Sequence, residues 1–133
     1  MTAQSFYRTV MDTSHQADPA TARRATAAVF HALRDRLTPD EADQVVAQLP
    51  IELKAVWEEG EQLERSPIKL KWDAFLERVR RESGLASARE ARWMTLAVFA
   101  ALKEQLSPGE AGDVLAQLPK SLKEVWVEAQ AEA

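Results

Sequence analysis

Apolar side chains recur every three or four residues along most of this chain, in segments separated by proline, glycine and helix-capping residues. This spacing places the apolar side chains on one face of an α-helix. No stretch alternates between apolar and polar residues for long enough to form a β-strand. The pattern predicts about eight helices, four in residues 6–59 and four in residues 75–128, and therefore an all-α fold.

The second half of the chain repeats the first half at an offset of 69 residues. Without a gap, 26 of the 54 residues in the segment 6–59 are identical to their counterparts in the segment 75–128. Since solenoid repeats are only about 20 to 50 residues long, we interpret the chain as two similar tandem four-helix units. The predicted organisation is a first unit in residues 1–60, a connection in residues 61–71 and a second unit in residues 72–133, together forming one compact domain.

Helix-boundary signals occur at equivalent places in the two units. The third helix of each unit opens with a hydroxyl residue, a proline and, two residues later, a glutamate that is expected to reach back to the cap. The same helix then ends at a proline, which lacks an N–H group. Just before that proline stands a glutamine, whose amide we expect to satisfy a carbonyl that the proline leaves unpaired. The residues concerned are Thr38, Pro39, Glu41, Gln48 and Pro50 in the first unit and Ser107, Pro108, Glu110, Gln117 and Pro119 in the second.

The segments LTPDEADQVVAQLP and LSPGEAGDVLAQLP, each followed by a Leu-Lys-x-Val-Trp stretch, resemble the bacterial domain of unknown function family 2267. Members of that family typically carry two copies of a helical unit with the AQLP break. The resemblance extends from about Phe6 to Glu128 and implies the helical fold. It implies no catalytic residue, because the family has no agreed biochemical activity. The connection departs from the family pattern, since Glu58-Glu59-Gly60-Glu61 stands where a Gly-Trp pair is common.

The composition fits a soluble protein of one-domain size and argues against several kinds of catalytic and metal site. Of the 133 residues 46% are hydrophobic, and the mean hydropathy is -0.34. The absence of cysteine excludes disulfides, thiolate metal sites and cysteine nucleophiles, while two histidines and four glycines are few for a metal cage or a phosphate-binding loop. We therefore expect no cofactor and no metal. The N-terminus shows no secretory signal and no segment is apolar enough to span a membrane, so a cytoplasmic protein without a membrane partner is expected.

Charge is unevenly distributed along the chain. The net charge is -4, yet the segment from Arg65 to Arg92 carries eight basic and four acidic residues. Such a segment can contact nucleic-acid phosphates, or it can be a solvated helix face that pairs with nearby acidic residues. We favour the second interpretation, because a negatively charged chain repels nucleic acid.

Candidate catalytic residues are few. His31 lies four residues before Asp35 on the predicted second helix, so the two side chains can meet on one face as an acid/base pair. The counterpart of His31 in the second unit is Ala100, and no nucleophile motif accompanies the pair. A structural histidine is the preferred interpretation, and we lean against an enzyme.

The tryptophans fall into two classes. Trp57 and Trp126 occupy equivalent positions, which predicts a packing role that the fold needs twice. Trp93 instead stands where the first unit has Arg24, and with Leu96 it adds an apolar stripe to the helix of the second unit. Either the connection or the first unit covers this stripe, or it is a surface for a partner protein or a second copy of the chain.

The leading functional hypothesis is a non-catalytic protein-interaction or scaffolding module with Trp93 and Leu96 in its partner surface. The alternative is weak nucleic-acid binding through the segment from Arg65 to Arg92, and the third hypothesis is an enzyme of unknown class.

Overall fold

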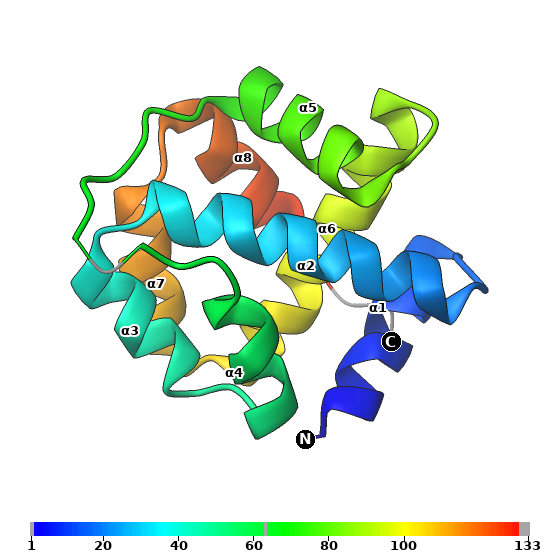
Figure 1. The fold of residues 1–133 in the computed structure, drawn as a ribbon, viewed down its shortest axis with the longest axis horizontal. Coiled ribbons are helices and arrows are strands. Elements are labelled where there is room, and N and C mark those ends of the chain that lie inside the picture. Colours follow the sequence, from blue (N-terminus) through cyan, green and yellow to red (C-terminus); the bar gives the residue numbers. More distant parts are fainter. Residues whose placement is uncertain (1, 63, 131–133) are drawn as a thin grey trace.

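The computed structural model describes residues 2–62 and 64–130. Eight α-helices and no β-strand lie in these residues, which confirms the all-α prediction (Figure 1). The helices are α1 (Ala3–Ser14), α2 (Pro19–Arg36), α3 (Pro39–Val46), α4 (Ile51–Glu58), α5 (Trp72–Ser83), α6 (Ala88–Gln105), α7 (Pro108–Gln117) and α8 (Lys120–Glu128). None of them is both long and apolar enough to cross a membrane.

Local signals account for where the helices begin and end. The hydroxyl oxygen of Thr38 accepts a hydrogen bond from the backbone N–H of Glu41 at 3.2 Å, and that of Ser107 accepts one from Glu110 at 3.1 Å. A proline follows each of these caps, as the sequence predicts. Helix α5 ends at Gly84 with a φ of 72°, a left-handed conformation that glycine adopts at little cost.

The first helix of each predicted unit packs on the second helix of the other. Helix α1 lies mainly against α6, and α5 lies against both α2 and α6, with α2 and α6 side by side at the centre (Figure 1). Phe6 and Val10 on α1, and Phe75 and Val79 on α5, are fully buried by this exchange. The hydrophobic core is therefore continuous across the predicted boundary. The division into two units with a connection remains a prediction.

Two rows of contacting aromatic rings lie in this core, at equivalent positions in the two halves. Phe30 contacts Phe6 and Trp57 edge-on, with ring centroids 5.6 and 5.3 Å apart. In the second half, Phe99 contacts Phe75 and Trp126 at 5.8 and 5.1 Å. Such tilted contacts suit the positive edge and negative face of an aromatic ring. Trp57 and Trp126 are buried, which confirms the packing role predicted for both.

The glutamines of the AQLP segments join α3 to α7. The side-chain Oε1 of Gln117 accepts a hydrogen bond from the backbone N–H of Thr38 at 2.9 Å, and its Nε2 donates to the Thr38 hydroxyl at 3.2 Å. In the same way, Oε1 of Gln48 accepts from the backbone N–H of Ser107 at 2.7 Å. Only the amide nitrogen can satisfy a carbonyl, and Nε2 of Gln117 donates to the Thr38 hydroxyl instead, so the role predicted near the proline is wrong for Gln117. Each glutamine instead holds the start of the helix in the opposite half.

Replacing Gln117 with alanine tests this connection. We expect a loss of about 1 to 2 kcal/mol in the free energy of unfolding, because the partly buried Thr38 N–H loses its acceptor. Urea unfolding at constant pH measures the change. The matched control is Gln44→Ala, which truncates an exposed glutamine on α3. Equal stabilities of the two variants would show that the cross-connection contributes nothing.

Candidate functional site

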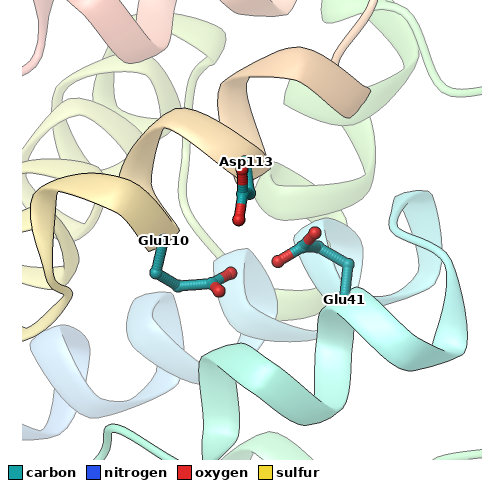
Figure 2. A group of neighbouring side chains, drawn as sticks. All are labelled: Glu41, Glu110 and Asp113. Carbon is teal, nitrogen blue, oxygen red and sulfur yellow. The ribbon is translucent and has the colours of Figure 1, made fainter.

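Three carboxylates from α3 and α7 come together where these two helices meet (Figure 2). Glu41 lies in the first turn of α3, Glu110 lies in the first turn of α7, and Asp113 follows one turn later on α7. One oxygen from each of the three side chains lies within 4.8 Å of the other two. Figure 2 shows the three carboxylates pointing toward one another across the gap between the helices.

Two of these carboxylates are withdrawn from solvent. Glu41 is 8% exposed and Glu110 is 5% exposed, whereas Asp113 lies at the exposed side of the cluster. The Oε2 atoms of Glu41 and Glu110 are buried and accept no hydrogen bond from an N–H or hydroxyl group among the residues that the structure describes. The prediction that these glutamates reach back to their own helix caps is therefore wrong, since their side chains point across to the neighbouring helix instead.

The cluster changes the acidity of Glu110. Burial, together with a hydrogen bond to Glu41 and the negative charges of Glu41 and Asp113, raises the pKa of Glu110 to about 8. Each of these causes disfavours the ionised carboxylate, so Glu110 holds a proton at neutral pH when the cluster contains nothing else. A carboxylic acid of this kind can exchange its proton for a cation.

Sequence reasoning missed the cluster for an identifiable reason. It assigned Glu41 and Glu110 to capping roles, and it judged metal binding from cysteine and histidine alone. The available signal was that Glu41 and Glu110 occupy equivalent positions in the two halves. Two such glutamates come close together if the helices that carry them, α3 and α7, pack on each other. Nothing in the sequence indicated that α3 and α7 do so.

A separate groove lies beside the predicted stripe on α6. It has a volume of about 430 Å³, and Trp93 is 45% exposed beside it. The side chains and backbone around it come from the ends of α1 and α8 as well as from α6. The lining residues are Thr13, Ser14, His15, Trp93, Leu96, Glu128, Ala129 and Gln130. Trp93 and Leu96 thus share a groove, which we call the Trp93 groove.

Among the described residues, none of the connection (61–71) lines the groove beside Trp93. The backbone N–H of Ile68 donates to the carbonyl of Asp35 at the end of α2, and that of Trp72 donates to the hydroxyl of Ser121 on α8. The neighbours that the groove does have are residues 13–15 of the first half and residues 128–130 near the C-terminus. The first half therefore flanks the stripe and leaves nearly half of the Trp93 side chain exposed.

The equivalent place in the other half of the chain holds a different side chain. Arg24 stands at the position equivalent to Trp93, and its Nε donates a hydrogen bond to the carbonyl of Ser83 at the end of α5, at 3.3 Å. The counterpart of Ser83 is Ser14, which lines the Trp93 groove. The groove therefore has a tryptophan where the other half has a guanidinium against a helix C-terminus, and such a terminus favours positive charge.

Comparison with known proteins places the chain in a family. The family model described as "Uncharacterized conserved protein (DUF2267)" matches residues 3–125. The chain belongs to the DUF2267 family. A search of curated proteins finds no match to it. The match confirms the resemblance seen in the sequence, and it assigns no activity to any residue.

In this DUF2267 protein, His31 and Asp35 take separate structural roles. Nε2 of His31 lies 2.7 Å from the carbonyl of Val56, a contact that ties α2 to α4. Asp35 accepts hydrogen bonds from Arg34 at 2.9 Å and from Arg78 at 2.8 Å. Burial opposes ionisation of Asp35, but the hydrogen bonds from the two guanidinium groups outweigh it and hold the pKa of the carboxyl below its usual value. A carboxylate so engaged is a poor general base.

Much of the basic segment is engaged within the DUF2267 chain. Arg65 donates hydrogen bonds to the carbonyls of Arg34 and Leu37 at the end of α2, at 2.8 and 2.7 Å. Further ion pairs join Arg78 to Asp35 and Glu82, Arg80 to Glu77, and Arg92 to Glu128. These contacts lower the positive charge that the segment presents to solvent.

Proposed function

We propose that this protein is a non-catalytic interaction module that binds a segment of another protein in the Trp93 groove. The observation that carries the proposal is the 45% exposure of Trp93 beside a groove of about 430 Å³. Exposed tryptophans contribute strongly to protein interfaces, because they bury a large apolar surface and lose little conformational freedom. Leu96 and Ala129 extend the apolar part of the groove.

The charge around the groove indicates the chemistry of the partner. The C-termini of α1 and α8 both reach the groove, and Glu128 adds a carboxylate at its edge. Helix C-termini attract cations, and in the opposite half Arg24 meets the equivalent helix end. The partner segment should therefore present a large apolar side chain to Trp93 and Leu96. Beside it, a lysine or arginine should point to the C-terminus of α1 at Ser14.

The basic segment supports nucleic-acid binding less well. Arg65, Arg78, Arg80 and Arg92 already contact carbonyls or carboxylates of the same chain. A phosphate would have to replace these contacts, and the rest of the chain carries a net negative charge.

The proposal predicts a selectable peptide ligand. Peptide display on the immobilised full chain should enrich sequences in which a large apolar residue neighbours a lysine or arginine. Fluorescence anisotropy with a labelled selected peptide then gives the dissociation constant. Trp93→Ala should weaken binding about 30-fold, the effect of losing one interface residue that contributes about 2 kcal/mol. Thermal unfolding of the variant confirms that the fold survives.

The control is Ile51→Ala, which truncates an apolar side chain that is 77% exposed at the start of α4. This variant should bind the peptide as the natural chain does. Selection without sequence enrichment, or a peptide that binds the Trp93→Ala variant equally well, would overturn the proposal. Light scattering that shows a dimer dissociated by Trp93→Ala would also overturn it, because the groove would then hold a second copy of the chain.

A further inference from the structure

We propose that Glu41, Glu110 and Asp113 bind one hard divalent cation, such as Ca²⁺ or Mn²⁺, between α3 and α7. The site lies at the contact of these two helices, whereas the Trp93 groove is formed by α1, α6 and α8. The inference is therefore independent of the proposed interaction function, and each can fail without the other.

The spacing of the oxygens fits a single ion. Calcium lies about 2.3 to 2.6 Å from its oxygen ligands, so two ligands of one ion are at most about 5 Å apart. One oxygen from each of Glu41, Glu110 and Asp113 lies within 4.8 Å of the other two. The spacing is therefore compatible with three oxygens on one such ion.

The buried oxygens give a second and separate reason. Oε2 of Glu41 and Oε2 of Glu110 are both inaccessible to water, and within residues 2–62 and 64–130 neither has a hydrogen-bond partner apart from the proton that Glu110 can share with Glu41. An acceptor buried in this way costs free energy unless something binds it. Both atoms belong to side chains that are more than nine-tenths buried and point into the cluster, as Figure 2 shows. A cation between them supplies the missing partner.

The ligand set selects the class of metal. All three members of the cluster offer carboxylate oxygens, which hard cations such as Ca²⁺ and Mn²⁺ prefer. Soft or borderline metals favour thiolate and imidazole, and the chain has no cysteine. Asp113 is exposed, so water has access to the remaining coordination positions from its side.

The cation would also connect the two halves of the chain. Because one glutamate comes from each half of the chain, the ion would fasten α3 to α7 beside the Gln48 and Gln117 contacts.

Isothermal titration of the chelator-treated full chain with CaCl₂ and with MnCl₂ tests the site. We expect one ion per chain with a dissociation constant of about 10⁻⁵ to 10⁻³ M at pH 8, the range of moderately charged oxygen sites.

Three variants make the test specific. Glu110→Gln and Asp113→Asn should each weaken binding at least about tenfold. Because Asp113 is exposed, its substitution should leave the fold intact, which thermal unfolding of the variant checks. Asp43→Asn removes an exposed carboxylate from α3 outside the cluster and should leave binding unchanged. Absence of binding by both ions at pH 8, or equal weakening by Asp43→Asn, would overturn the proposal.

Discussion

Trp57→Ala should lower the free energy of unfolding by about 4 kcal/mol, because the substitution opens a cavity in the core. The Trp57 side chain is fully buried and its ring packs against that of Phe30 at 5.3 Å. Its Nε1 has no hydrogen-bond partner in the described part of the chain, so the loss comes from packing rather than from a broken hydrogen bond. Urea unfolding of the two proteins, followed by circular dichroism, measures the difference.

The same substitution at Trp93 is the control. Trp93 is 45% exposed and contacts the guanidinium of Arg89, whose Cζ lies 4.7 Å from the ring centroid. We expect Trp93→Ala to cost less than about 1 kcal/mol, as is usual for surface positions. A loss at Trp93 as large as that at Trp57 would contradict the assignment of Trp57 to the core and of Trp93 to the surface.

Glu110→Gln should stabilise the protein at pH 8 in the presence of a chelator, by about 2 to 4 kcal/mol. The pKa of Glu110 is raised from 4.5, the ordinary value for a glutamate, to about 8 in the fold, with burial as the main cause and Glu41 and Asp113 adding to it. The folded chain therefore holds this proton more tightly than the unfolded chain. Its contribution to stability is complete below about pH 4.5 and is lost as the pH rises through about 8.

Glutamine stays neutral at every pH and keeps the size of the side chain. The variant should therefore lack the loss of stability that the natural chain shows between about pH 5 and pH 9 from this group. Thermal unfolding across that range measures the difference. Asp43→Asn, which removes an exposed carboxylate from α3, is the control for the change in net charge. Parallel pH profiles of the natural chain and Glu110→Gln would show that Glu110 is an ordinary carboxyl group.

The helices could be predicted from the sequence because their signals are local. The three-and-four spacing of Phe30, Leu33 and Leu37 defines a buried face, and all three side chains are fully buried in the structure. The caps at Thr38 and Ser107 depend on a hydroxyl group and a backbone N–H three residues later. The equivalent burial of Trp57 and Trp126 followed from comparing the two halves of the chain.

The candidate site could be predicted only in part. The stripe at Trp93 and Leu96 stood out because Arg24 and Ala27 replace these residues in the other half. The groove beside the stripe depends on the ends of α1 and α8, which the helical pattern does not position. The carboxylate cluster was not predicted at all. Glu41 is far in the sequence from Glu110 and Asp113 and meets them only through the packing of α3 on α7.

The sequence by itself determined the class of fold, the capped starts of α3 and α7, and the helix faces that bury Phe30 and Phe99. Only the tertiary structure decided which helix covers which face: α1 lies on α6 and α5 on α2, across the predicted boundary between the units. The physical reason is that apolar burial is not directional, so a hydrophobic face specifies that it must be covered but not what covers it. The glutamine contacts and the carboxylate cluster depend on that choice, because both require α3 and α7 to be neighbours.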